Sequence, residues 1–305
     1  MKEIKTVGII GLGALGVLYA HLLTEAVGRD RVLVLADRDR IDRYRTQEFS
    51  CNGRSCSFNF TVASDVTEPV DLLIFSVKFG GLTAAIETCH HLVGPETTLV
   101  SVLNGITSEQ LLCEAFDPRQ VVWCIAQKMA VTKRGNAVTA DPPGELALGV
   151  PAGQDPTHLN RLAAFFTAAD FPYSLPEDVR TQMWSKLLCN TGCNQTTMVF
   201  ECGYGGLQQE GEARTVMLGA MREVVLVANA EGIPLSEQDV ENWTAILDSF
   251  PPDGETSMRQ DSKAHRKSEV ELFAGTVRRL AAKHGIAVPV NDWIYERVKE
   301  MEAAY

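Results

Sequence analysis

The stretch Gly11-Leu12-Gly13-Ala14-Leu15-Gly16 decides the fold of this chain. It follows a short apolar run, residues 5–10, and opens a segment with helical apolar spacing, residues 14–27. In such a strand–turn–helix unit the first glycine permits a tight turn, the second leaves room for a pyrophosphate, and the third lets the helix pack on the strand. The helix N–H groups then face the phosphates. The motif predicts a dinucleotide-binding domain, although glycines that only allow close packing are the alternative.

The next predicted strand, residues 32–36, ends at Asp37, which lies 21 residues after Gly16. A carboxylate at that position accepts hydrogen bonds from a ribose 2′-OH and repels a 2′-phosphate, so it favours NAD. The arginines that follow, Arg38 and Arg40, can instead hold a 2′-phosphate if the carboxylate turns away. The residues leave NAD and NADP both open.

Apolar runs rich in Val, Ile and Leu alternate with helical segments through the first half of the chain, as in residues 70–77, 82–92 and 98–103. This pattern is typical of a parallel sheet covered on both faces. Residues 121–150 are expected to add antiparallel strands to the sheet edge, and after Leu175 only helices are expected, including one over residues 263–284. We therefore predict an α/β fold with a Rossmann-type domain, residues 1–175, and an all-helical domain, residues 176–305.

The composition narrows the class of function. The 305 residues carry a formal net charge of −11, which disfavours nucleic acid and anionic membranes as partners. The eight cysteines are scattered through apolar contexts without a CxxC pair, which is typical of free thiols in a reducing cytoplasm. The best zinc candidates, Cys189 and Cys193, lack a second ligand pair in the sequence. We expect a cytoplasmic protein without a metal site.

Several polar residues stand where chemistry is expected. Lys78 and Asn104 directly follow two of the predicted parallel strands, at the end where open α/β sheets bind ligands. Lys186, Asn190 and Asn194 are spaced i, i+4, i+8 in an apolar helical segment, so they share one face. Asparagine is a mediocre helix former, and this stripe indicates a ligand site, with a buried structural hydrogen-bond network as the alternative. The segment with Ser257 and Glu269 is expected to form a charged amphipathic helix that begins after Ser257.

Taken together, these pieces resemble the ketopantoate reductase (2-dehydropantoate 2-reductase) family over nearly the whole chain. The resemblance rests on GLGALG, on the SVK of residues 76–78, on the LNG of 103–105, on WSKLLCN of 184–190, on TSMRQD…KSEVE and on the terminal GIAVP. It implies an NAD(P)H-dependent reductase of a 2-keto acid, with ketopantoate as the expected substrate. The family favours NADP.

The resemblance also implies roles for individual residues. Lys186 matches the catalytic lysine, and Glu269 matches an acidic residue associated with substrate binding and catalysis. Asn104 and Lys78 match residues near the nicotinamide and the substrate. Further substrate contacts are implied at Asn190, Asn194 and Ser257. Hydride addition to a ketone leaves negative charge on oxygen, which a lysine ammonium can stabilise and protonate.

Two departures from the family pattern leave alternatives open. Some members have arginine where Asp37 stands, and some have an additional substrate asparagine where Tyr204 stands. A related reductase of another keto or imino acid is therefore the second hypothesis, and a non-catalytic nicotinamide-binding sensor is the third. We expect a monomer or a homodimer.

Overall fold

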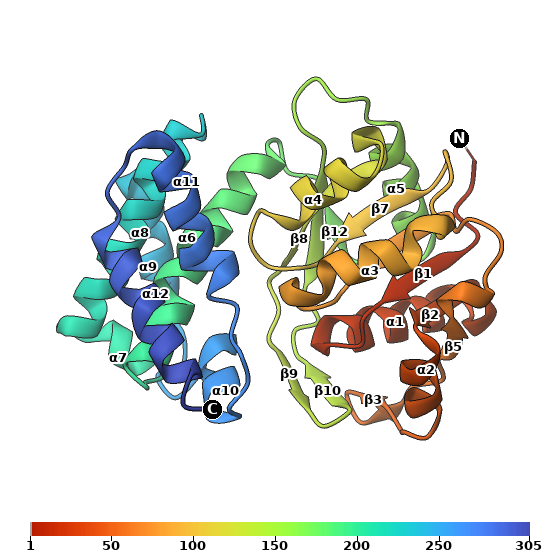
Figure 1. The fold of residues 1–305 in the computed structure, drawn as a ribbon, viewed down its shortest axis with the longest axis horizontal. Coiled ribbons are helices and arrows are strands. Elements are labelled where there is room, and N and C mark those ends of the chain that lie inside the picture. Colours follow the sequence, from red (N-terminus) through yellow and green to blue (C-terminus); the bar gives the residue numbers. More distant parts are fainter. Residues whose placement is uncertain (1) are drawn as a thin grey trace. The chain divides into compact units, whose positions relative to one another are not determined.

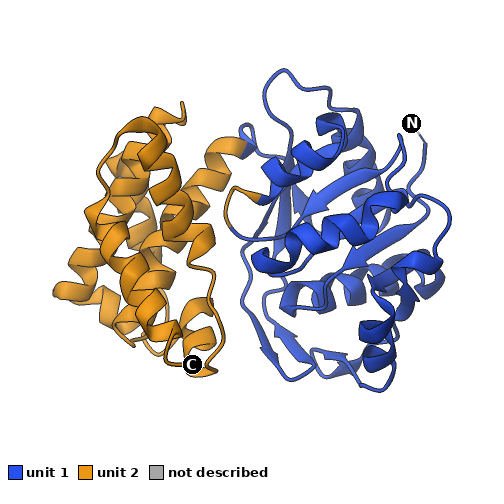
Figure 2. Ribbon diagram, in the orientation of Figure 1, with its two compact units in different colours: residues 1–104, 108–179 blue, residues 105–107, 180–305 orange. Residues whose placement is uncertain are grey.

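The computed structural model describes residues 2–305, and these form two compact units (Figure 2). Unit 1 comprises residues 1–104 and 108–179, and unit 2 comprises residues 105–107 and 180–305. The sequence placed the boundary after Leu175, whereas the division falls after Val179, the first residue of a long helix. The three residues 105–107 were also expected in the first domain but belong to unit 2.

Unit 1 is built on an eight-stranded sheet with the order β12-β11-β8-β7-β6-β1-β2-β5 (Figure 1). The strands are β1 (Val7–Ile10), β2 (Val32–Ala36), β5 (Asn59–Val62), β6 (Leu72–Phe75), β7 (Thr98–Ser101), β8 (Val121–Gln127), β11 (Glu145–Gly149) and β12 (Tyr173–Ser174). From β5 to β8 all neighbours are parallel, and β11 is antiparallel to β8. Along this parallel part the strands follow the doubly wound order of dinucleotide-binding domains, which confirms the predicted fold class.

Five α-helices connect the strands of unit 1: α1 (Ala14–Val27), α2 (Arg38–Arg45), α3 (Leu82–Cys89), α4 (Ser108–Ala115) and α5 (Thr157–Ala168). Buried residues of α1 and α5 join one hydrophobic cluster, and those of α3 and α4 join another. Because β1, β6 and β7 lie between these clusters, every residue of these three strands is buried. This explains why these strands are largely apolar and carry no charged residue.

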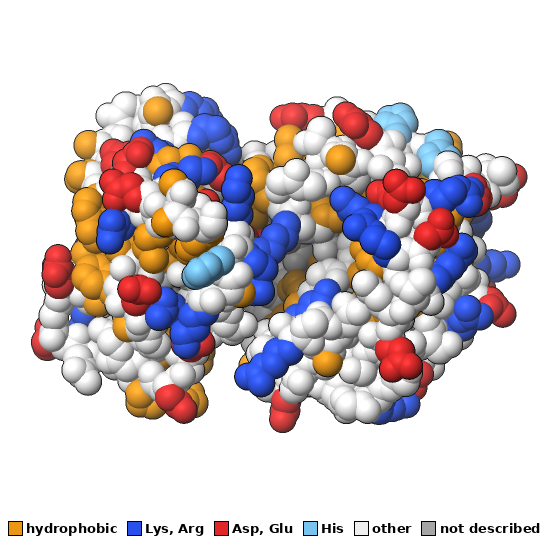
Figure 3. Space-filling view, turned by 60° about the horizontal axis from the view of Figure 1, so that its bottom comes forward, with side chains coloured by type: hydrophobic (Ala, Val, Ile, Leu, Met, Phe, Trp, Pro, Cys, Tyr) orange, Lys and Arg blue, Asp and Glu red, His pale blue; other side chains and the backbone are white. Residues whose placement is uncertain are grey.

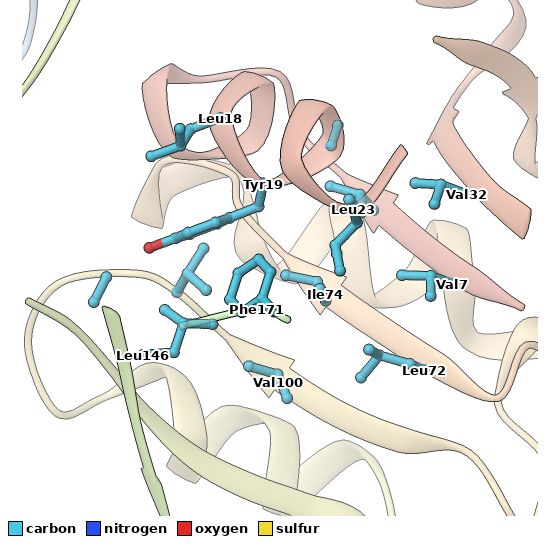
Figure 4. Packing of buried hydrophobic residues seen from close by; sticks show 14 of the residues in the cluster. Val7, Leu18, Tyr19, Leu23, Val32, Leu72, Ile74, Val100, Leu146 and Phe171 are labelled. Carbon is cyan, nitrogen blue, oxygen red and sulfur yellow. The ribbon is translucent and has the colours of Figure 1, made fainter. Parts of the chain in front are cut away.

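The cluster beneath α1 fixes the start of that helix over the sheet. Tyr19 is 2% exposed, and its ring centroid lies 5.9 Å from that of Phe171. Figure 4 shows Leu23 pointing from α1 toward Ile74 of β6, and Tyr19 lying beside Phe171. Burying large side chains of this kind stabilises the fold by about 1.5–3 kcal/mol each, so this packing anchors α1 on the sheet.

A second, four-stranded sheet in unit 1 corrects one expectation. The strands β9 (Val131–Arg134) and β10 (Ala137–Ala140) do not extend the edge of the main sheet. They pair instead with the hairpin β3 (Ser50–Cys51) and β4 (Arg54–Ser55), in the order β4-β3-β10-β9. The Asn52-Gly53 turn of that hairpin has positive φ at both residues, 48° and 75°. The Asn-Gly pair is the sequence signal for this hairpin, and our sequence analysis missed it.

Unit 2 consists of helices, as the sequence predicts. They are α6 (Val179–Val199), α7 (Tyr204–Gln208), α8 (Glu212–Ala230), α9 (Glu237–Asp248), α10 (Ser257–Lys263), α11 (Thr276–His284) and α12 (Pro289–Glu302). The first residue of α6, Val179, still belongs to unit 1, and unit 2 resumes at Arg180. The helix expected over residues 263–284 is wrong in its first half. The chain turns out of α10 at His265, where φ is 48°, and resumes in a π-helical turn, η6 (Glu271–Gly275), before α11.

Candidate functional site

The glycine-rich turn of unit 1 has the shape that a pyrophosphate requires. Gly11 has a φ of 100°, and a Cβ built on it would lie 2.6 Å from the carbonyl oxygen of Ser76. A Cβ on Gly16 would lie 1.9 Å from the carbonyl oxygen of Gly11. Gly13 differs from both, because its Cβ would meet only that Ser76 oxygen, at 3.6 Å. Two glycines are therefore required by packing, and Gly13 leaves space on the exposed side of the turn.

The first turn of α1 supplies the donors that this space needs. Gly13 is the N-cap, no side chain caps the helix, and no acidic residue stands in its first turn. Val17 N–H bonds the Gly13 carbonyl, so the backbone N–H groups of Ala14, Leu15 and Gly16 precede the first intrahelical bond. With the helix dipole they form a positively polarised site. The residues present fit the phosphates of a dinucleotide.

Asp37 and Arg38 follow β2, but the structure gives each a partner. Asp37 is the N-cap of α2, and its Oδ1 accepts a hydrogen bond from Arg40 N–H at 2.8 Å. Arg38 forms an exposed ion pair with Asp65, 2.9 Å from Nη2 to Oδ1. An N-cap of this kind contributes about 1 kcal/mol, so the Asp37 carboxylate has a structural role in addition to any contact with a ribose.

Lys78 and Asn104 lie beyond the carboxyl ends of the adjacent strands β6 and β7, as expected. Lys78 is the N-cap of a 3-10 turn, η3 (Phe79–Gly81). Asn104 is the last residue of unit 1 before the chain enters unit 2 at Gly105. Because β6 and β7 are hydrogen-bonded neighbours in parallel register, the two residues follow the same edge of the sheet as the glycine-rich turn after β1.

In unit 2, α6 carries the predicted stripe. Lys186, Asn190 and Asn194 are each partly buried, between fully buried apolar residues such as Leu187 and Leu188. Asn190 Nδ2 is buried and has no hydrogen-bond partner among the described residues. A buried donor without a partner costs about 1–3 kcal/mol, which favours a ligand site over a saturated structural network.

Ser257 joins this stripe from α10. Its Oγ accepts a hydrogen bond of 3.4 Å from Asn194 Nδ2. The neighbouring Thr256 is the N-cap of α10, and its hydroxyl lies 2.7 Å from that of Thr197 on α6. The start of α10 is therefore fastened to α6, which brings Ser257 and Asn194 together. Ser257 is the first residue of the helix, so α10 begins one residue earlier than we expected.

Glu269 lies between α10 and η6, and not on the continuous helix that the sequence predicted. Its carbonyl accepts a hydrogen bond from Leu272 N–H at 2.9 Å. The segment that follows is anchored to α6, because Gln195 Oε1 accepts a buried hydrogen bond from Ala274 N–H at 2.9 Å. Residues 105–107 pack on the same segment: a Cβ on Gly105 would lie 3.3 Å from Leu272, and Thr107 and Thr276 share a hydrogen bond.

Tyr204 is the first residue of α7, the short helix that follows α6 in the chain. Burial raises the pKa of its hydroxyl, and the nearby thiols of Cys193 and Cys189 act in the same direction. Its ring lies edge-on to Phe250, with 5.0 Å between the centroids. Cys189 and Cys193 precede Asn190 and Asn194 by one residue each. An aromatic side chain therefore lies near the part of α6 that carries Cys189 and Cys193.

The sequence analysis did not identify two residues that contact the segments described above. Gln195 is hydrogen-bonded to the π-helical turn, and its only indication in the sequence is that it is a further polar residue directly after Asn194. Lys133 of β9 donates a hydrogen bond of 2.6 Å from Nζ to the carbonyl oxygen of Leu12, within the glycine-rich turn. Sequence gave no signal for Lys133, because it lies 121 residues from Leu12.

Comparison with known proteins identifies the family. Two family models match, both described as ketopantoate reductase PanE/ApbA: one over residues 7–153 and the C-terminal one over residues 178–302. The chain belongs to the ketopantoate reductase family. As a member it is an oxidoreductase that acts on CH–OH groups with a nicotinamide dinucleotide. The resemblance stated from the sequence motifs is thereby confirmed.

Relatives and solved structures extend this result along the chain. The 2-dehydropantoate 2-reductase of Aquifex aeolicus is 26% identical, with 96% of each chain covered. That of Vibrio cholerae is 24% identical, with 97% of this chain and 98% of the relative covered. Among solved structures, a dimeric ketopantoate reductase from Staphylococcus aureus has a TM-score of 0.80 at 23% identity, over 98% of this chain and 99% of that one. D-mandelate dehydrogenase with NADH and anilino(oxo)acetate has a TM-score of 0.86 at 21% identity, with the same coverage.

Other kinds of site are not seen in the part of the chain that the structure describes. Residues 2–305 contain no group of three or more His, Cys, Asp or Glu side chains suited to a metal ion. No helix in that range has the length and apolarity to cross a membrane. All eight cysteines are free thiols, and burial raises the pKa of Cys89 to about 12. Acidic and basic side chains are interspersed over the face that Figure 3 presents.

Proposed function

We propose that this protein reduces 2-dehydropantoate to pantoate with NADPH or NADH, a step of pantothenate and coenzyme A synthesis. The single observation that carries the proposal is the polar stripe of α6, in which Lys186 and Asn190 share a face with the pair formed by Asn194 and Ser257. This stripe lies in a chain of the ketopantoate reductase family. A lysine with several neutral amide and hydroxyl groups is a donor set suited to a 2-keto acid.

The reduced dinucleotide, when bound, supplies the hydride that adds to the keto carbon. As that carbon becomes tetrahedral, negative charge develops on its oxygen. Lys186 is assigned to stabilise this charge and to donate the proton that completes the hydroxyl. The partly buried position of Lys186 on α6 supports this role, because a charge in a drier environment interacts more strongly with a developing alkoxide.

The substrate carboxylate is assigned to Asn190, Asn194 and Ser257. The unpaired amide of Asn190 offers a donor whose desolvation cost the substrate would offset. Ser257 already accepts from Asn194, so its own hydroxyl proton can be given to a carboxylate oxygen. Glu269 is assigned to the substrate hydroxyl or to the catalytic network, and Asn104 is assigned to the substrate and the nicotinamide.

The cofactor is assigned to unit 1, with its pyrophosphate on residues 11–16 and Lys78 beside the nicotinamide end. We propose dual use of NADH and NADPH, with a preference under about 100-fold in either direction. Asp37 disfavours a 2′-phosphate but is engaged in capping α2. Arg38 can bind that phosphate only by exchanging its exposed partner Asp65, and an exposed pair of this kind is worth at most about 1 kcal/mol.

A second candidate substrate class, a different 2-keto acid, is favoured by one observation. Tyr204 places a large ring near Cys189 and Cys193, the chain neighbours of Asn190 and Asn194, at a position where some family members have an asparagine. An aromatic ring contributes apolar contact area in place of a hydrogen bond. This substitution keeps the reaction class and changes which substituent on the keto acid is favoured.

The direct test is turnover of the purified protein on a panel of keto acids, including 2-dehydropantoate and an aromatic 2-keto acid, with each cofactor. We expect kcat/KM to be highest for 2-dehydropantoate. A higher kcat/KM for the aromatic compound would show that the substrate is a different 2-keto acid, while the proposed mechanism would stand. An absence of turnover with every keto acid, in protein that binds the dinucleotides, would contradict the proposed function.

A further inference from the structure

The turn that follows Glu269 has a hydrogen-bond pattern that differs from that of an α-helix. In an α-helix the carbonyl of Val270 would accept a hydrogen bond from the N–H of Ala274, four residues later. Here it accepts one of 2.9 Å from the N–H of Gly275, five residues later. The π-helical turn η6 therefore holds one residue more than an α-helical turn, and the N–H of Ala274 is directed to an acceptor outside it.

That acceptor is Gln195 of α6, which is 0% exposed. Its Oε1 accepts from the N–H of Ala274 at 2.9 Å, and its Nε2 donates to the carbonyl of Thr191, one turn earlier on α6, at 2.8 Å. The second bond fixes the amide against its own helix with the oxygen toward Ala274. A buried N–H without an acceptor is destabilising, so Gln195 favours the π-helical turn.

The extra residue of this turn sets the direction in which Glu269 faces. Successive residues of an α-helix lie about 100° apart around the helix axis. If η6 became an α-helical turn, the residues before it would rotate by about that angle relative to α11. Short π-helical turns are frequently found at functional sites, and this one immediately precedes α11 and follows Glu269 by one residue.

The chain is also held on the other side of Glu269. Ser268 donates from its N–H and from its hydroxyl to Oε1 of Glu302 on α12, at 2.7 Å and 2.6 Å. Glu269 therefore lies between two fixed points of the backbone. The later of these is bonded to Gln195, which directly follows Asn194 of the polar stripe. The helix α6 thus carries the stripe and fixes the segment that follows Glu269.

We propose that Gln195 is a positioning residue, which maintains the π-helical turn and so orients the carboxylate of Glu269 for the keto acid. This inference rests on the proposed function, in which Glu269 is assigned to the substrate hydroxyl or to the catalytic network. Because Gln195 is fully buried, it acts through the backbone of η6 and does not touch the substrate itself.

The test is a double-mutant cycle, read as kcat/KM for the keto acid that the wild type reduces best. Gln195→Met keeps the length of the side chain and removes both of its hydrogen bonds. We expect it to lower kcat/KM by about 10–100-fold, with an unchanged dissociation constant for NADH, since the cofactor is assigned to unit 1. In the Glu269→Gln background, Gln195→Met should change kcat/KM by less than about twofold, because its effect passes through Glu269.

Gln120→Met is the matched control. Gln120 is 6% exposed, and its Nε2 likewise donates to the backbone, at two carbonyl oxygens. It ends the 3-10 turn η5 (Pro118–Gln120) before β8 in unit 1. This control should lower the melting temperature and leave kcat/KM unchanged. If Gln195→Met does not fold, Gln195→Asn takes its place with the same kinetic expectation, because its amide is one methylene shorter and should lose the bond to Ala274.

Wild-type kcat/KM in the Gln195 variant would overturn the proposal. So would a double variant whose loss is the product of the two single losses, because Gln195 and Glu269 would then act independently. Wild-type kinetics in Glu269→Gln would also overturn it. If the wild type reduces no keto acid, the proposed function and the role of Gln195 both fail. If the wild type is active and the two losses multiply, the proposed function stands and only the role of Gln195 fails.

Discussion

Arg38 Nη2 lies 2.9 Å from both carboxylate oxygens of Asp65, so the arginine proposed to bind a 2′-phosphate is paired with an acidic side chain. Asp65 ends the short 3-10 turn η2 (Ala63–Asp65) that follows β5, at the edge of the sheet. The side chains of Arg38 and Asp65 are both more than half exposed, at 60% and 54%. The pair is therefore weak enough to open when a phosphate competes for the guanidinium.

This pair predicts how substitutions shift cofactor choice, read as the ratio of kcat/KM with NADPH to kcat/KM with NADH. Asp65→Asn should raise the ratio several-fold, because it releases Arg38. Asp37→Ala should also raise it, and it should cost about 1 kcal/mol of stability through the lost cap of α2. Arg38→Ala should lower the ratio. If none of the three moves it, Asp37 and Arg38 do not contact the adenosine ribose.

Substitution of Lys186 should strongly lower the rate of the chemical step and leave the affinity for the cofactor nearly unchanged. We expect Lys186→Ala to lower kcat by about 10²–10⁴-fold, the usual range for a positioned proton donor. Lys299→Ala is the matched control, because that lysine is on α12 and pairs with Glu271. Near-normal kcat in Lys186→Ala, measured at saturating cofactor, would show that another group donates the proton.

Glu269 and Glu271 offer a comparison within one segment. Glu269→Gln should raise KM for the keto acid and lower kcat, with little change in melting temperature. Glu271→Gln should leave the kinetics unchanged, because Glu271 bonds Tyr295 and Lys299 on α12. The role of Glu269 would be structural if its substitution lowered the melting temperature strongly while the folded fraction kept wild-type kinetics.

Glu109 should make stability depend on pH. Burial raises the pKa of this carboxyl from about 4.5 to about 7, although the hydroxyl of Ser108 donates a hydrogen bond to it and opposes the rise. The folded protein keeps the proton where the unfolded chain has lost it, so the neutral form stabilises the fold fully below about pH 4.5. That stability is lost as the pH rises through about 7, by roughly 3 kcal/mol.

Urea unfolding at about pH 5 and about pH 7.5 checks this. Glu109→Gln should remove most of the decline in unfolding free energy between the two pH values. Glu114→Gln, at an exposed position on the same helix, should retain the decline. An equal decline in unfolding free energy between the two pH values in the wild type and in Glu109→Gln would contradict the assignment of this pH dependence to Glu109.

The sequence was informative wherever local patterns governed the structure. The glycine spacing, the apolar runs and the helical stripe predicted the doubly wound sheet, the bounds of α1 and β2, and the sharing of one face by Lys186, Asn190 and Asn194. The prediction of one continuous helix after Lys263 was wrong. The amphipathic spacing of charged residues continues through this segment, but tertiary hydrogen bonds such as that of Gln195 accompany a π-helical turn there.

Pairings between distant residues were beyond the reach of local patterns. Nothing near Arg38 in the sequence indicates Asp65, and nothing near Leu12 indicates Lys133. The hairpin at Asn52 is a different case, because its Asn-Gly turn was readable. The pairing of this hairpin with β10 is supported by Asn52 itself, whose side chain is hydrogen-bonded to both the N–H and the carbonyl of Ala140.

Residues 105–107 carry a consequence for synthesis and for protein engineering. They belong to unit 2 but are translated more than 70 residues ahead of the rest of it, since unit 1 resumes at Ser108 and continues to Val179. All of unit 1 is therefore synthesised before Gly105 can contact Leu272. A fragment cut at residue 180 would lack that contact and the bond between Thr107 and Thr276. Chimeras that exchange the helical unit between family members should therefore carry this tripeptide with it.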